Sequence, residues 1–351
     1  MQNYEARMRR KADALMERGH ARILSVESSC DETAIAVVED GRIERANAIA
    51  SQIDVHALYG GVVPEIASRK HLECISQVAD EALEQAGLGY GELDAVAVTY
   101  GPGLIGALLV GVSYAKALAY ALKKPLIGVH HIKAHLSANY VEHPDLKPPF
   151  VGLVASGGHS HIVYARDYID FAVLGRTRDD AAGEAFDKVA RTLGLGYPGG
   201  PLLEKLAREG DCQTYAFPRV RFENLDFSFS GVKTAVINTM HMAEQRGETI
   251  KKADVAASFQ QAVTDVLVGH TIEAAKREGV RQVALAGGVA ANSYLRDAFT
   301  RAAEENGLQF YCPRPRLCTD NAVMVGCAAY FMAQRGEYAD LSLNAYANLP
   351  F

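Results

Sequence analysis

Three histidines lie within six positions of the stretch GVHHIKAHLSA, at His130, His131 and His135. The residues before them predict a strand that ends at Val129, and a helix is expected to start near His131. Histidines four residues apart lie on one face of a helix, so His131 and His135 could chelate a metal ion. The alternative is that the two imidazoles merely share a partly buried face. His130 falls in the turn between strand and helix and is expected to point elsewhere.

A third metal ligand could come from the stretch CTDNAVMVG, where Asp320 precedes an apolar helix. Two histidines and one carboxylate with open coordination positions suit iron or zinc. An acidic residue in front of a helix could equally serve as an ordinary N-cap, and the sequence leaves both roles open. The zinc-peptidase signature HExxH requires Glu directly after the first histidine. Ile132 stands at that position, which argues against a zinc peptidase.

The elements that must position these residues form a repeated α/β pattern. A three-stranded meander interrupted by a polar turn starts near residue 22, and residues 150–175 repeat this arrangement. Each half then continues with a helix and a unit of strand, glycine-rich turn, helix and strand. We therefore expect a duplicated α/β fold in which each half buries a sheet between helices. The second half is longer, and its extra residues, mostly within 176–240, are expected to cover a cleft between the halves.

Two glycine-rich turns could receive a nucleotide, SGGHS at 156–160 and AGGVAAN at 286–292. Glycines allow backbone N–H groups to approach a phosphate, and the second turn opens a helix whose N-terminus favours an anion. Neither turn matches the P-loop or the dinucleotide-binding fingerprint. In a duplicated α/β architecture, we expect ligand chemistry at the interface of the halves.

Composition limits the partners of the chain. Its 351 residues are 49% hydrophobic, and its net charge of −6 gives no general attraction to nucleic acid. A nucleic-acid partner would have to be held by local basic segments, for which 175–180, 217–222 and 314–316 are candidates. Apolar runs are too short to predict a membrane span, and six scattered cysteines without a CxxC pair suggest a reducing compartment. A cytoplasmic protein is expected, with an extra surface helix at 1–21.

The sequence resembles the TsaD/Kae/Gcp family of tRNA threonylcarbamoyladenosine-forming transferases, which are built on the actin-like ATPase fold. The resemblance covers about residues 22–346. It is carried, in order, by the motifs ESSCDETAIAV, YGGVVPEIASRKH, GPGLIGALLVG, HHIKAH, SGGHS, DDAAGEAFDKVAR, GYPGGP, DFSFSGVKT, AGGVAANSYLR and CTDNAVM.

The resemblance implies a duplicated actin-like fold with two lobes and a central ligand cleft. The lobes would comprise 22–149 and 150–351, after an N-terminal extension helix at 1–21, with the cleft-covering insertion at about 176–240. The implied reaction passes a threonylcarbamoyl group from threonylcarbamoyl-AMP to the N6 amine of an adenosine and releases AMP. That adenosine lies beside the anticodon in tRNAs that read codons beginning with A.

Site residues follow from the matching motifs. The metal ligands would be His131, His135 and Asp320, with iron as the usual ion and zinc or magnesium as alternatives. The donor would contact a set of residues in the second half: Val154, Ala155, Ser156, Gly157, Gly158, Asp187, Gly200 and Asn292. A carboxylate that accepts the proton of the attacking amine would assist the reaction, and Asp31 and Glu32 in the first polar turn are candidates.

The resemblance also implies partner proteins. The motifs SCDETA and GEAFDK look bacterial, and bacterial members act with a TsaB-like inactive paralogue and a TsaE-like P-loop ATPase. Since the chain contains no Walker motif, ATP-driven turnover would have to come from such a partner. The alternative function is an ATP-dependent phosphotransferase or binding module of the same fold, which would not need the His131, His135 and Asp320 set.

Overall fold

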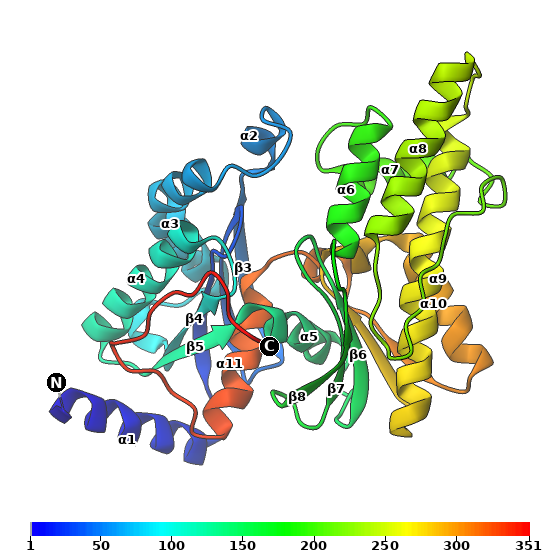
Figure 1. Ribbon diagram of the computed structural model, residues 1–351. Coiled ribbons are helices and arrows are strands. Elements are labelled where there is room, and N and C mark those ends of the chain that lie inside the picture. The colour runs from blue at the N-terminus through cyan, green and yellow to red at the C-terminus, as the bar shows by residue number, and fades with distance from the viewer. Residues whose placement is uncertain (1) are drawn as a thin grey trace. The chain divides into compact units, whose positions relative to one another are not determined.

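The computed structural model describes residues 2–351 and divides the chain into two compact α/β units (Figure 1). Unit 1 comprises the residues up to Lys147 together with Asp320–Phe351, and unit 2 comprises Pro148–Thr319. The sequence-based division assigned residues 320–351 to the second lobe. The structure differs because the last helix of the chain packs on the sheet of unit 1.

The sheet of unit 1 has the strand order β3-β2-β1-β4-β5. Strands β1 and β2 pair antiparallel, as do β2 and β3, which confirms the predicted meander, whereas β4 and β5 continue the sheet in parallel. The strand bounds are β1 Arg22–Glu27, β2 Glu32–Glu39, β3 Ile43–Ser51, β4 Ala95–Gly101 and β5 Leu126–His130.

Two pairs of helices cover this sheet, and Figure 1 shows them on opposite faces. Helices α3 (Pro64–Ala86) and α4 (Ile105–Leu122) pack over Leu24 and Val26, whereas α5 (His131–Glu142) and α11 (Ala322–Gln334) pack together on the other face. The remaining helices of unit 1 are α1 (Gln2–Arg18), α2 (Ile53–Ala57) and the short η1 (Tyr90–Glu92). Helix α4 is long and apolar enough to cross a membrane, but it packs here as a sheet-covering helix.

Unit 2 repeats the topology of unit 1, with the strand order β10-β9-β6-β7-β8. Strands β6, β7 and β8 form the antiparallel meander, and β9 and β10 continue it in parallel. This repetition confirms the duplicated fold expected from the sequence. The strand bounds are β6 Phe150–Ala155, β7 Ser160–Ala165, β8 Phe171–Arg176, β9 Gln282–Ala286 and β10 Gln309–Tyr311.

The predicted insertion within 176–240 forms helices rather than an irregular loop. Helices α6 (Ala182–Thr192), α7 (Gly199–Ala207) and the first part of α8 (Ser230–Arg246) lie in it, and all three pack on α9 (Lys252–Glu278). Buried Phe186, Phe227 and Phe259 belong to the core that joins these helices to the sheet. Unit 2 is completed by η2 (Gly288–Ala291), α10 (Ser293–Glu305) and η3 (Pro315–Leu317).

Candidate functional site

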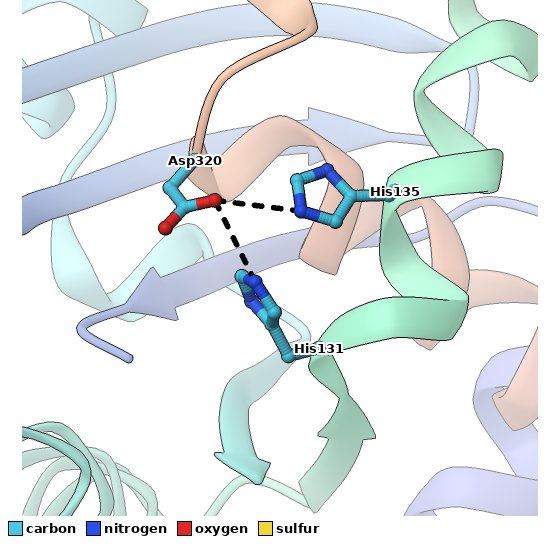
Figure 2. Close-up of side chains that lie close together, drawn as sticks. All are labelled: His131, His135 and Asp320. Atoms are coloured by element: carbon cyan, nitrogen blue, oxygen red, sulfur yellow. Dashed lines mark ion pairs between the residues drawn. The ribbon is translucent and has the colours of Figure 1, made fainter. Parts of the chain in front are cut away.

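The structure brings His131, His135 and Asp320 together within unit 1, as Figure 2 shows. Asp320 Oδ1 lies 3.5 Å from Nε2 of His131 and 3.4 Å from Nε2 of His135. The helix begins at His131, as predicted, and the strand before it ends at His130, one residue later than predicted. Both histidines are buried, and the Asp320 side chain is 22% exposed. Two imidazoles and one carboxylate therefore converge on one point.

The N-cap of helix α11 is Asn321 and not Asp320. The side-chain oxygen of Asn321 accepts a hydrogen bond from the Met324 N–H at 3.0 Å. The N-cap role that the sequence left open for Asp320 therefore belongs to its neighbour. Asp320 belongs to the same compact unit as the two histidines, not to the other half of the chain as expected from the sequence.

The site also contains Glu27, at the end of β1, which the sequence analysis did not single out. Its Oε2 lies 3.1 Å from His131 Nδ1, on the side of the ring away from Asp320. The carboxylate is fully buried and accepts hydrogen bonds from the Ser29 N–H at 2.6 Å and the Thr99 hydroxyl at 2.6 Å. The sequence could have indicated this residue, because Glu27 is acidic and ends a strand that is mostly apolar and buried.

The carboxylates around His131 set its charge. Burial alone lowers the pKa of this imidazole, but Glu27 and then Asp320 outweigh burial and raise it to about 9. For Glu27 the directions are reversed. Burial raises the pKa of this carboxyl group, but the charge of the neighbouring His131 outweighs burial and holds the pKa below its ordinary value. The contact therefore favours the charged form of each group.

The geometry fits a metal ion. Bonds of about 2.1 Å at tetrahedral angles place two ligand atoms ~3.4 Å apart, close to both separations from Asp320 Oδ1. Among the described residues, neither ring nitrogen of His135 has a hydrogen-bond partner, although the ring is 1% exposed. Buried polar atoms rarely stay unpaired, and a metal bond at Nε2 would satisfy one of them. Glu27 would then hold His131 in the tautomer that ligates through Nε2.

His130 is directed away from this group. Its Nε2 lies 3.2 Å from the carbonyl oxygen of Pro350, and its ring meets the Phe351 ring edge-on at 5.8 Å. A second group of possible ligands, His20, Glu39 and Asp40, lies elsewhere in unit 1. There, Arg22 and Arg45 both bond to the Glu39 carboxylate, so cations of the protein already occupy it.

Asp31 lies in the turn between β1 and β2, and Glu32 is the first residue of β2, close enough to Asp320 for its charge to act on Glu32. Burial, the charge of Asp31 and that of Asp320 raise the pKa of Glu32 to about 9. Ser51 donates a hydrogen bond to Glu32 at 2.8 Å. The raised pKa favours the protonated form of Glu32.

In unit 2 the two glycine-rich turns lie at one edge of a single sheet. Strands β6 and β9 are parallel with Val154 opposite Ala286, so the turns that follow them are neighbours. Gly287 has φ +90°, and a Cβ there would lie 2.4 Å from the Ala155 carbonyl oxygen. A Cβ at Gly183 would lie 2.7 Å from the Ser156 carbonyl oxygen. Glycine is required at both positions for this close packing. Beside Gly157 and Gly158, by contrast, there is open space.

Two helix N-termini in unit 2, those of α7 and α10, are capped by protein groups. Asp187 Oδ1 accepts from the N–H groups of Gly199 and Gly200, and Asn292 caps α10 while donating to Gln260. Glu204 also accepts from the Ser293 N–H and hydroxyl. The α10 N-terminus, which the sequence suggested could favour an anion, thus has the Glu204 carboxylate beside it.

Two of the basic segments suggested for nucleic acid carry arginines that are paired with carboxylates. Arg178 bonds to Asp226 at 3.0 Å, and Arg219 bonds to Asp265 at 2.7 Å. Each pair neutralises a charge that a phosphate would need, which weakens these segments as nucleic-acid contacts.

Comparisons with known proteins show the family of the chain. The model of the family described as "TsaD: tRNA N6-adenosine threonylcarbamoyltransferase" matches residues 44–327. A protein of that name from Clostridium novyi is 58% identical over 331 residues, which cover 93% of this chain and 97% of the relative. One from Clostridium perfringens (strain SM101) is 58% identical over 329 residues, with the same coverage.

Solved structures show the fold. Full-length HypF in a phosphate- and nucleotide-bound form superimposes with a TM-score of 0.62 at 15% identity, over 90% of this chain and 46% of HypF. Component A of the (R)-2-hydroxyglutaryl-CoA dehydratase of Acidaminococcus fermentans gives a TM-score of 0.51 at 16% identity, over 90% and 98%. Both are actin-like ATPase folds, and so is this chain. The chain therefore belongs to the tRNA N6-adenosine threonylcarbamoyltransferase family, and it is a transferase that modifies tRNA.

Proposed function

We propose that this chain takes the threonylcarbamoyl group from threonylcarbamoyl-AMP and transfers it to N6 of the adenosine beside the anticodon in tRNAs that read A-starting codons. AMP is the leaving group. The observation that carries the proposal is the convergence of His131, His135 and Asp320, backed by Glu27. A phosphotransferase or nucleotide-binding module of the same fold has no need of this set.

His131, His135 and Asp320 hold a divalent metal in this proposal. Two imidazole nitrogens and one carboxylate oxygen with open positions favour iron, and zinc or magnesium are the alternatives. When bound, such a cation would act as a Lewis acid on the oxygen of the carbamoyl group, where negative charge develops during attack. Glu27 orients His131, and the buried environment keeps the histidine rings in place.

Asp31 and Glu32 divide the proton chemistry between them. Burial and the neighbouring carboxylates raise the pKa of Glu32 to about 9, which favours its protonated form. In this scheme Asp31 accepts the proton that leaves the adenosine amine as the new C–N bond forms. An Asp31→Asn variant is expected to lose transfer by about 100-fold or more while its metal content stays unchanged.

The donor is recognised by Val154, Ala155, Ser156, Gly157, Gly158, Asp187, Gly200 and Asn292. The open space beside Gly157 and Gly158 leaves their backbone accessible to a ligand. Asp187 and Asn292 cap helices, so they hold the backbone of this edge in shape as well as facing the donor. Because protein side chains cap the α7 and α10 N-termini, the nucleoside is a better fit to this edge than a phosphate.

Turnover in the cell involves partners in this proposal. A TsaB-like paralogue and a TsaE-like P-loop ATPase supply what the chain lacks, since it contains no Walker motif. A cytoplasmic location follows from the tRNA substrate.

Substitution of the ligands tests the proposal. His131→Ala and His135→Ala are each expected to lose both bound metal, measured by elemental analysis, and transfer of labelled threonine to tRNA. His130→Gln is the matched control and should retain the metal, because His130 faces Pro350 rather than Asp320. Full transfer by either alanine variant, or ATP-dependent phosphorylation of a small substrate without tRNA, would refute the proposal.

A further inference from the structure

A cluster of four cations lies where α1 meets the C-terminal end of α4. It consists of Arg7 and Lys11 on α1, and Lys123 and Lys124 after α4, and we call it the α1–α4 basic patch. The Lys11 ammonium donates a hydrogen bond to the Lys123 carbonyl oxygen at 2.8 Å, which joins segments 112 residues apart. All four residues of the patch belong to unit 1, and none of them is part of the metal group.

Within the described part of the chain, none of the four patch residues forms an ion pair with a carboxylate. Burial, and then the charges of Lys124, Arg7 and Lys123, lower the pKa of Lys11, so like charges are close enough to repel. Two lysines of unit 2, by contrast, are paired with a carboxylate, because Lys188 and Lys233 both bond to Asp180.

The backbone at Lys123 adds an independent observation. This residue caps α4 in the left-handed conformation with φ +54°, a position that usually holds glycine. A side chain with a Cβ is disfavoured in this conformation. The lysine thus places a further cation beside Lys11 and Lys124 at a conformational cost that glycine would avoid.

Unpaired cations of this kind suit the phosphates of a nucleic acid. The chain carries 36 basic and 42 acidic residues, so only a local patch can attract a polyanion. Arg7 and Lys11 are four residues apart and lie on the same side of α1, and Lys11 bonds to the backbone of Lys123. A membrane surface is disfavoured, because the apolar residues Met8, Ala12 and Leu15 are buried in the protein and cannot insert into lipid.

We propose that the α1–α4 basic patch contacts the phosphate backbone of the tRNA substrate, outside the nucleotide that is modified. The inference rests on tRNA being the substrate. The patch adds affinity without touching the reacting atoms, so it governs how much tRNA is bound and not the rate of the chemical step.

The test compares the parent protein with the triple variant Arg7→Gln, Lys11→Gln and Lys124→Gln in the complete transfer reaction over 50–200 mM salt. Loss of three phosphate contacts is expected to reduce the log–log salt slope of KM for tRNA by about 2.1–2.7. Between those salt concentrations, the KM of the parent should therefore rise about 20- to 40-fold more than that of the variant. We expect kcat at saturating tRNA and the metal content to stay unchanged.

Two controls make the result specific. The triple variant Arg166→Gln, Arg246→Gln and Arg277→Gln removes the same charge from exposed arginines that face Asp170, Glu248 and Glu273, and it should keep the parental slope. The charge-conserving triple variant Arg7→Lys, Lys11→Arg and Lys124→Arg should also keep it. Loss of slope in the first control, or an unchanged slope in the patch variant, would overturn the inference. So would patch-dependent binding to anionic lipid vesicles together with unchanged tRNA kinetics. A parent protein without transfer activity would instead count against the enzyme function itself.

Discussion

Glu27 and His131 form the contact on which the metal group depends. The carboxylate lies at the end of a buried strand, receives hydrogen bonds from Ser29 and Thr99, and in turn contacts Nδ1 of His131. A charge with no exposure is tolerated because each of its oxygens has a partner. This arrangement fixes the imidazole before any ion binds.

We predict that Glu27→Gln lowers metal affinity about 10- to 100-fold, because an amide holds the His131 ring less firmly and with less negative charge. Competition against a chromogenic chelator measures the change. Glu39→Gln is the matched control, since Glu39 is also a buried glutamate of unit 1 but bonds to Arg22 and Arg45. Equal affinities for Glu27→Gln and the parent would contradict the role given to Glu27.

At the scale of elements, the position of α11 determines whether Asp320 reaches the histidines. This helix lies close against β1 and β2, where Ser25 donates to the Ala322 carbonyl oxygen at 2.6 Å. A Cβ on Gly326 would lie 2.6 Å from Cγ2 of Val38 and 2.9 Å from Oγ of Ser25. Glycine at this point lets the helix approach the sheet.

Gly326→Ala is therefore expected to reduce the free energy of unfolding by about 1–3 kcal/mol, because the added methyl group overpacks the contact with Val38. Gly269→Ala is the matched control, since it also lies inside a helix but its Cβ would meet nothing within 4 Å. That exposed change should stabilise the protein by about 0.5–1 kcal/mol. Chemical denaturation measures both, and a stabilised Gly326→Ala variant would show that α11 packs less closely.

A second contact between elements involves Asp180, which receives hydrogen bonds from Lys188 of α6 and Lys233 of α8. Burial alone would raise the pKa of Asp180, but the two lysines outweigh it and hold the pKa below the ordinary 3.8. A depressed carboxyl pKa gives stability that is fully present above the unfolded value of 3.8. That stability is lost as the pH falls through the folded value.

Asp180→Asn should consequently destabilise unit 2 by about 1–2 kcal/mol at pH 7, and the difference from the parent should shrink below pH 3.8. Denaturant titrations at pH 7 and pH 3 measure this. Asp170→Asn removes an exposed carboxylate that lies 4.0 Å from Arg166, and its effect should stay within about 0.5 kcal/mol. A destabilisation that persists unchanged in acid would rule out the charge as its cause.

At the scale of the whole molecule, the three metal ligands belong to a single unit although they lie 189 positions apart at the extremes, from His131 to Asp320. A ligand that binds only the folded state stabilises the part of the molecule that contains its site. A metal ion held by these three residues is therefore expected to stabilise unit 1.

Hydrogen exchange should detect this stabilisation. Metal at about 100 times its Kd is expected to increase the protection of α5 and α11 by up to about 2.7 kcal/mol and to leave β9 and α9 of unit 2 unchanged. A chelator should reverse the increase. Equal protection of both units would show that the ion couples them, contrary to this expectation.

The sequence by itself determined the duplicated α/β fold, because strand and helix patterns are local and repeat in both halves. It also determined that His131 and His135 share a helix face, since four-residue spacing fixes that geometry. Only the tertiary structure decided that Asp320 joins them, because packing of α11 on β1 and β2 is a long-range event. For the same reason, contacts from Glu27 to His131 and from Glu204 to Ser293 could not be read from local patterns. Which carboxylates orient a ligand and which cap a helix depends on residues far away in the chain.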